Sequence, residues 1–79
     1  MKAYIKNIES FIQAKIKTYV KCYCTEKGDL MCEIAFTDTP ARIKIHDIQE
    51  YFHQGYYSEQ IANMIVSIYK KQVYEKYFI

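Results

Sequence analysis

The chain has 79 residues, of which 51% are hydrophobic and 25% charged, and its formal net charge is +2. A chain of this length forms one domain, residues 1–79, which buries only about 60% of the surface that the unfolded chain exposes. The mild charge excludes a strongly basic nucleic-acid-binding protein. No apolar run reaches the roughly 18 residues of a membrane span. Three cysteines without a secretory signal predict free thiols and a cytoplasmic location.

The first predicted element is an amphipathic helix over residues 4–16. Apolar residues recur there at spacings of three and four, with Glu9 and Gln13 on the polar side. The residues before it offer no capping side chain, so we expect an uncapped first turn. The apolar stripe consists of Tyr4, Ile5, Ile8, Phe11, Ile12 and Ile16.

Three alternating runs between Thr18 and His46 predict a three-stranded antiparallel meander. Residues 26–28 form a three-residue hairpin loop in which Gly28 takes the left-handed position of a type I turn with a G1 bulge. Thr25 then lies opposite Asp29, and the apolar faces of the two strands coincide. The predicted pairs are Val20 with Ile34, Lys21 with Glu33, Cys22 with Cys32, Tyr23 with Met31, and Cys24 with Leu30.

The second hairpin is expected to close through a four-residue loop, residues 38–41. The outer face then carries a histidine beside a carboxylate, whose default interpretation is a surface ion pair. The predicted pairs are Thr37 with Arg42, Phe36 with Ile43, Ile34 with Ile45, and Glu33 lying between Lys21 and His46.

Two helical patterns follow the meander. Asp47 is placed to cap a short helix through about Gln54, which Gly55 ends. Ser58 is placed to cap a last helix that runs to about Tyr77. The expected fold is therefore an α+β two-layer domain of the order α-β-β-β-α-α, with helices on one face of the antiparallel sheet. The apolar face of the last helix comprises Ile61, Met64, Ile65 and Ile68.

The cysteines offer the most chemistry, since Cys22, Cys24 and Cys32 all fall on the predicted inner face. A Cys-x-Cys spacing is not that of a zinc knuckle, so we expect small buried hydrophobic residues and no metal. Under oxidation Cys22 and Cys32 can form a cross-strand disulfide, although a reduced pair is expected in the cytoplasm. The sequence also lacks motifs for an activated nucleophile or a phosphate-binding loop, and predicts neither an enzyme nor a cofactor.

The outer face of the sheet is the predicted binding surface. Exposed tyrosines beside mixed charges are typical of protein interfaces, and they favour a protein-binding module or inhibitor. The alternative is a nucleic-acid binder, in which Tyr19 and Tyr23 stack on bases while Lys21, Arg42 and Lys44 hold phosphates. A third interpretation is that the tyrosines only pack across strands. The predicted site comprises Tyr19, Lys21, Tyr23, Glu33, Arg42, Lys44 and His46.

The C-terminal segment is the second candidate surface, because an apolar chain end must pack on its own core, on a second copy or on a partner. A homodimer through the last helix is one of these outcomes. The residues assigned to this contact are Tyr69, Val73, Tyr74, Tyr77 and Phe78.

The element order also resembles that of some small phage or mobile-element inhibitors of bacterial nucleases, the anti-CRISPR proteins among them. In those proteins a helix precedes a three-stranded meander and two helices follow. The resemblance implies an inhibitor of a nucleic-acid enzyme such as a CRISPR nuclease. Several of those inhibitors mimic DNA with an acidic surface, whereas this chain carries a net charge of +2. A partner would therefore meet a tyrosine-rich or mixed-charge surface.

Overall fold

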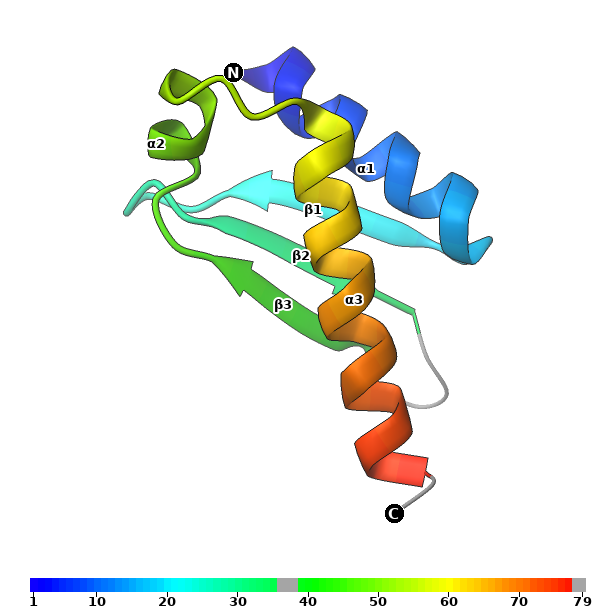
Figure 1. Ribbon diagram of the computed structural model, residues 1–79. Helices are drawn as coiled ribbons and strands as arrows, with labels where there is room; N and C mark the ends of the chain where they lie inside the picture. The colour runs from blue at the N-terminus through cyan, green and yellow to red at the C-terminus, as the bar shows by residue number, and fades with distance from the viewer. Residues whose placement is uncertain (36–38, 78–79) are drawn as a thin grey trace.

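The computed structural model describes residues 1–35 and 39–77, the last helix by its backbone alone at Tyr74, Lys76 and Tyr77. It confirms the predicted α+β order α-β-β-β-α-α, with a sheet of strand order β1-β2-β3 (Figure 1). The elements are α1 (Lys2–Ile16), β1 (Val20–Cys24), β2 (Leu30–Ile34), β3 (Ala41–Ile45), α2 (Ile48–His53) and α3 (Ser58–Tyr77).

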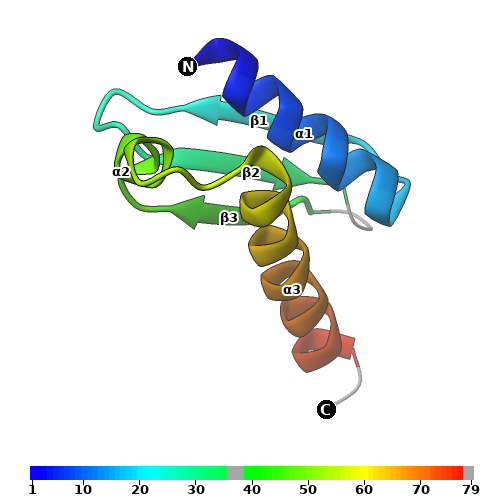
Figure 2. The ribbon, with the colours of Figure 1, turned by 45° about the horizontal axis from the view of Figure 1, so that its top comes forward.

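The helices lie on one face of the sheet. Helix α1 follows β1, whereas α3 crosses the sheet obliquely and its second half runs beyond the strands (Figures 1 and 2). Helix α2 lies at the end of the sheet where the β1–β2 loop turns (Figure 1). The described helices therefore leave the opposite face of the sheet uncovered.

The core lies between the inner face of the sheet and helices α1 and α3. Strand β2 alternates strictly between buried and half-buried side chains, as a central strand with one covered face should. Phe11, assigned to the apolar stripe of the first helix, instead lies at its flank and is 37% exposed. The largest fully buried side chains are those of Ile8, Ile12, Val20, Leu30, Cys32, Ile34, Ile48, Ile61 and Ile65.

The first hairpin has the predicted register in all five pairs, from Val20 with Ile34 to Cys24 with Leu30. Gly28 has a φ of 87°, the left-handed conformation that the turn requires. The Thr25 amide donates to the Asp29 carbonyl at 2.8 Å, and the Gly28 amide donates to the Thr25 carbonyl at 3.0 Å. The turn chemistry therefore fixed this register correctly.

The predicted register of the second hairpin is wrong. Ile34 pairs with Ala41 and not with Ile45, so β3 is displaced along β2 by four positions. An even displacement keeps Ile43 and Ile45 on the inner face, which is why the apolar pattern cannot detect it. The predicted partners Phe36 and Thr37 lie outside the described residues, but Ile43 pairs with Cys32 and Arg42 with Glu33.

In the observed register of β3, the first hairpin also forms hydrogen bonds with the start of α2. The Ile48 amide donates to the Gly28 carbonyl at 3.0 Å, and the Asp47 amide donates to Asp29 Oδ1 at 2.9 Å. Together they attach the start of α2 to the β1–β2 turn, and β3 must reach far enough along the sheet to permit this. The paired residues Ile34 and Ala41 are separated by residues 35–40, six residues in place of the four-residue loop that we predicted.

The helix starts differ from the predicted caps. Asp47 is the N-cap residue of α2, but its φ is 49° and its side chain forms no capping hydrogen bond. Ser58 lies inside α3, and its hydroxyl donates to the Tyr4 carbonyl at 3.4 Å. Gln60 Oε1 instead accepts the Tyr57 amide at 2.7 Å, so a side chain three residues into the helix supplies the cap. The predicted absence of a side-chain cap on α1 is confirmed.

Within the two described ranges, no helix combines the length and the apolar character needed to cross a membrane.

Candidate functional site

The outer face of the sheet gathers most of the predicted binding residues in two rows that run across the strands. Strand pairing places Lys21, Glu33 and Arg42 in one row, and Tyr23, Met31 and Lys44 in the next. Tyr19 extends the surface at the start of β1, where its carbonyl accepts the Ala35 amide at 2.9 Å. Its side chain is 68% exposed, the larger exposure of the two tyrosines on this face.

Glu33 is the centre of a connected network on this face. Its Oε2 accepts a hydrogen bond from the Tyr23 hydroxyl at 3.3 Å and lies 3.5 Å from Arg42 Nε. Lys21 Nζ lies 5.8 Å from the centre of the Tyr23 ring, a cation–π distance. Partial burial, and then the negative charge of Glu33, raise the pKa of Tyr23, so its hydroxyl stays protonated as a donor. The network therefore holds the Tyr23 ring and the Arg42 guanidinium group in place around the Glu33 carboxylate.

His46 does not join this network, contrary to the prediction that it lies beside Glu33. Arg42 occupies that position in the observed register. His46 Nδ1 instead lies 3.1 Å from Asp29 Oδ1, with 88% of the His46 side chain exposed. Lys44 Nζ lies 3.9 Å from Asp29 Oδ2. The predicted site therefore divides into the network around Glu33 and a second cluster around Asp29.

Asp29 is a key residue that the sequence reasoning missed. Only 4% of it is exposed, and its carboxylate accepts the Asp47 amide while its own amide donates to Thr25 Oγ1 at 3.2 Å. The hydrogen bond from Asp47 lowers the pKa of Asp29, and the charges of His46 and Lys44 lower it further, against the opposing effect of burial. Asp29 thus links the hairpin to α2, and no spacing rule connects residues so far apart.

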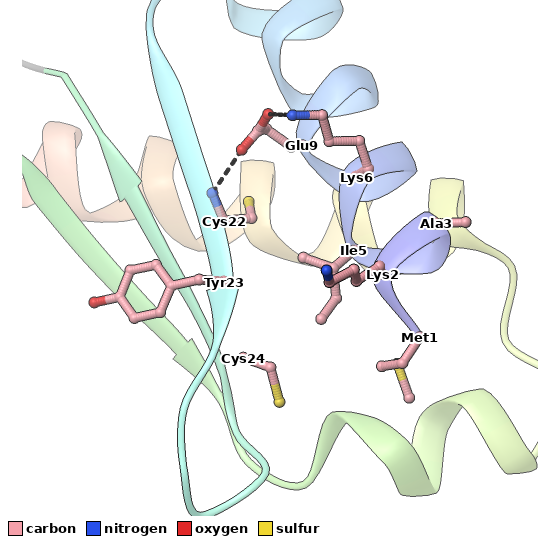
Figure 3. Close-up of a pocket in the computed structure, with 9 residues that line it drawn as sticks. All are labelled: Met1, Lys2, Ala3, Ile5, Lys6, Glu9, Cys22, Tyr23 and Cys24. Atoms are coloured by element: carbon pink, nitrogen blue, oxygen red, sulfur yellow. Dashed lines mark hydrogen bonds and ion pairs between the residues drawn. The ribbon is translucent and has the colours of Figure 1, made fainter.

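An open groove of about 780 Å³ lies between the start of α1 and the outer strand β1. Figure 3 shows Met1, Lys2 and Ile5 on the helix side of this groove, with Cys22 and Cys24 on the strand side. Sequence reasoning missed this groove, because the helix start was expected only to cover the sheet.

The prediction that all three cysteines are buried is wrong. Cys32 is buried, Cys22 is half-buried and Cys24 is exposed. Cys24 lies at the end of β1, where α1 leaves the strand uncovered (Figure 3). In this position its thiol donates to the Thr25 carbonyl at 3.5 Å.

Cys22 and Cys32 lie side by side, with 2.9 Å between their sulfur atoms. Contact with Cys22, together with burial, raises the pKa of the Cys32 thiol. The residues in the described ranges hold no cluster of three or more histidine, cysteine or acidic side chains that could bind a metal ion.

Two polar side chains of α1 form hydrogen bonds with backbone groups of β1 on the side of the strand that faces away from β2. Glu9 Oε2 accepts the Cys22 amide at 2.9 Å, and Gln13 Nε2 donates to the Val20 carbonyl at 3.1 Å. Lys6 Nζ lies 3.7 Å from Glu9 Oε1, on the groove side. An unpaired strand edge invites association with other strands, and these side chains close part of it.

The C-terminal surface is described only in part. Tyr69 packs partly buried against the core, where burial raises the pKa of its hydroxyl, and Val73 is half-buried. The side chains of Tyr74 and Tyr77, and the whole of Phe78, lie outside the described residues. Among the side chains of α3 that the structure describes, the buried ones all belong to its first half, which lies over the sheet (Figure 2).

Comparison of the chain with models of protein families, with curated proteins and with solved structures found no match.

Proposed function

We propose that the protein is a non-catalytic binding domain that contacts a protein partner through the outer face of its sheet. The supporting observation is the network around Glu33, in which Tyr23 and Arg42 are already held in place on an open face. Tyrosine and arginine are the residues most enriched at the centres of protein interfaces. Side chains that are ordered before binding lose less entropy when the partner arrives.

The same network favours a protein over a nucleic acid as the partner. Base stacking needs a free aromatic face, but Lys21 Nζ lies over the Tyr23 ring. Phosphate binding needs available cations, but Arg42 is paired with Glu33. A carboxylate at the centre of the surface would also repel a phosphate backbone.

Nucleic-acid binding remains the second candidate function, because Lys21, Arg42 and Lys44 outnumber Glu33 on this face. Binding of this kind weakens steeply with salt, whereas a protein interface centred on tyrosine changes much less. Mobility shifts with single- and double-stranded oligonucleotides at 50 and 200 mM salt, roughly the range over which phosphate contacts lose affinity, separate the two functions. No shift at the lower concentration would exclude the nucleic-acid function.

Partner capture with matched variants tests the main proposal. Immobilised wild-type protein is compared with the variants Tyr19→Ala and Glu33→Ala in capture from host lysate. Tyr57→Ala is the control, because Tyr57 is 77% exposed like Tyr19 but lies at the start of α3. We expect a partner that wild type and the control retain, and that each outer-face variant binds about tenfold more weakly. Equal retention by all variants would refute this surface as the site.

The resemblance in element order to phage inhibitors gives the proposal a partner class. A nucleic-acid enzyme such as a CRISPR nuclease would be bound and inhibited. Cleavage assays with such nucleases, with Glu33→Ala as the inactive comparison, test this class directly. Unchanged cleavage at saturating wild-type protein would remove it.

Self-association through α3 is a further part of the proposal. Its second half runs beyond the sheet (Figures 1 and 2), and Val73 there is only half-buried. Sedimentation of the full chain against a chain truncated after Gln72 tests whether this segment joins two copies. A full-length monomer at high micromolar concentration would refute the dimer. We also propose a cytoplasmic location, because free cysteines such as these three are typical of reducing compartments.

A further inference from the structure

Cys22 and Cys32 occupy a position from which a cross-strand disulfide can form. Two other pairs of this ladder, Thr25 with Asp29 and Tyr19 with Ala35, are joined by backbone hydrogen bonds, and each lies three positions away from Cys22 and Cys32. Because hydrogen-bonded and non-hydrogen-bonded pairs alternate along an antiparallel ladder, this odd separation predicts a non-hydrogen-bonded pair for the cysteines. The Cys22 amide instead points away from β2 and donates to Glu9. Cys22 and Cys32 are therefore a non-hydrogen-bonded pair, for which the Cα atoms are about 4.5 Å apart. That separation lies within the range that disulfides span.

The two thiols differ in their access to solvent. Cys22 is half-buried and lines the open groove beside α1 (Figure 3), whereas Cys32 is fully buried in the core. Their sulfur atoms are 2.9 Å apart, so a group that reacts at Cys22 is within reach of Cys32. The pKa of the Cys32 thiol is raised, which keeps it protonated while Cys22 reacts first.

We infer that Cys22 and Cys32 form a redox-active dithiol that a small-molecule disulfide, such as oxidised glutathione, converts into an intramolecular disulfide. In the first step the Cys22 thiolate attacks one sulfur of the oxidised glutathione. A mixed disulfide forms at Cys22, and one glutathione thiolate leaves and takes up a proton. In the second step Cys32 attacks Cys22 Sγ, the bond between Cys22 and glutathione breaks, and the proton of Cys32 passes to the departing glutathione, which leaves as a thiol. Two protein thiols are oxidised, and one disulfide is reduced to two thiols.

The groove has the charge to receive such an oxidant. Lys2 and Lys6 line it beside Cys22, and glutathione carries carboxylates that these ammonium groups can attract. Lys6 also pairs with Glu9, which keeps the carboxylate of Glu9 partly neutralised on that side. An anionic disulfide can therefore approach the thiol that reacts first.

Cys24 lines the same groove but serves as the internal control. Its strand partner is Leu30, so the register places no thiol opposite it. It is the most exposed of the three cysteines, and it can form a mixed disulfide with glutathione without the second step. The variant Cys24→Ser removes this side reaction and leaves the dithiol intact.

Equilibration of the folded protein in glutathione redox buffers, followed by acid quenching, alkylation and peptide mass mapping, tests the inference. Wild type and Cys24→Ser should both yield one disulfide that joins Cys22 to Cys32. Cys32→Ser should stop at a mixed disulfide on Cys22, because the resolving thiol is missing. Cys22→Ser should leave Cys32 unmodified, because no oxidant reaches it.

Three results would overturn the inference. Wild type could retain both thiols in oxidised glutathione alone, the mapped disulfide could include Cys24, or Cys32→Ser could remain unmodified at Cys22. The wild-type map decides the first two without any variant, so a variant that fails to fold leaves the test valid. The partner-binding proposal is unaffected, since it rests on the opposite face of the sheet.

Discussion

Glu9 joins the first helix to the outer edge of the sheet, because its Oε2 accepts the backbone amide of Cys22 at 2.9 Å. Gln13, one turn later, donates to the Val20 carbonyl on the same edge. One flank of α1 therefore serves as a partner for backbone groups that a fourth strand would otherwise bind. The helix both covers the core and limits association of β1 with other chains.

Replacement of Glu9 by Ala should lower the free energy of unfolding by about 1.5 to 3 kcal/mol, the range for a hydrogen bond to a charged group. The side chain of Glu9 is only 18% exposed, so water replaces the lost acceptor poorly. Glu9→Gln keeps an oxygen acceptor and should lose less. Urea denaturation of the three proteins measures the difference. A Glu9→Ala variant as stable as wild type would show that the amide of Cys22 needs no partner.

Asp29 should make the stability of the fold depend on pH under acidic conditions. Folding lowers its pKa from the ordinary value of 3.8. The ionised form therefore stabilises the fold above that value, and this stabilisation is lost as the pH falls through the lowered pKa. Asp29→Asn should be less stable than wild type at neutral pH, and the gap should narrow in acid.

Thermal unfolding of both proteins between about pH 6 and pH 2, a window that begins above the ordinary aspartate pKa and ends well below it, measures this gap. Glu26→Gln, which removes an exposed carboxylate from the same hairpin, controls for the change in net charge. A gap between wild type and Asp29→Asn that stays constant over the whole range would contradict the assigned role.

Gly28→Ala should destabilise the protein by about 1 to 2 kcal/mol through its backbone alone. Gly28 has a φ of 87°, and a Cβ added there would meet no atom within 4 Å, so no steric clash contributes. Gly28→Asn should cost less, because asparagine tolerates the left-handed conformation. Chemical denaturation ranks the three proteins. Equal losses for Ala and Asn would point to a cause other than the left-handed backbone.

Tyr4→Phe should cost about 1 kcal/mol, the usual net value of one hydrogen bond. The Tyr4 hydroxyl donates to the Tyr56 carbonyl at 2.7 Å and joins α1 to the segment between α2 and α3. The ring of Tyr4 packs edge-on against Phe52 with centroids 4.9 Å apart, a contact that Phe retains. The exposed Tyr57→Phe serves as the control in thermal unfolding. Matching midpoints for both variants would show that this hydrogen bond adds no stability.

The sequence predicts the register of the first hairpin correctly and that of the second wrongly, because only the first loop contains a residue that restricts the register. A glycine in a three-residue loop admits one register, and the structure has it. The loop before β3 contains no such residue, and registers that differ by an even number bury the same side chains. In the observed register of β3, the Asp29 side chain accepts a hydrogen bond from the backbone amide of Asp47, which lies far away in the sequence. Alternation along a strand carries no information about this hydrogen bond.

The candidate site shows the same limit. The pattern correctly assigns Lys21, Tyr23, Glu33, Arg42 and Lys44 to one face, since alternation determines the face of each strand residue. It pairs Glu33 with the wrong neighbour, because neighbours depend on register. It also buries Cys24, because alternation cannot indicate where a covering helix begins.

Helix α2 has six residues, fewer than the roughly 12 that an isolated helix needs to be even marginally stable in water. Its first turn is attached to the β1–β2 turn, and the segment after it is attached to α1 through Tyr4. The stability of α2 therefore depends on its contacts with the hairpin and the first helix. Its amides should therefore exchange with solvent hydrogen sooner than those of the central strand β2.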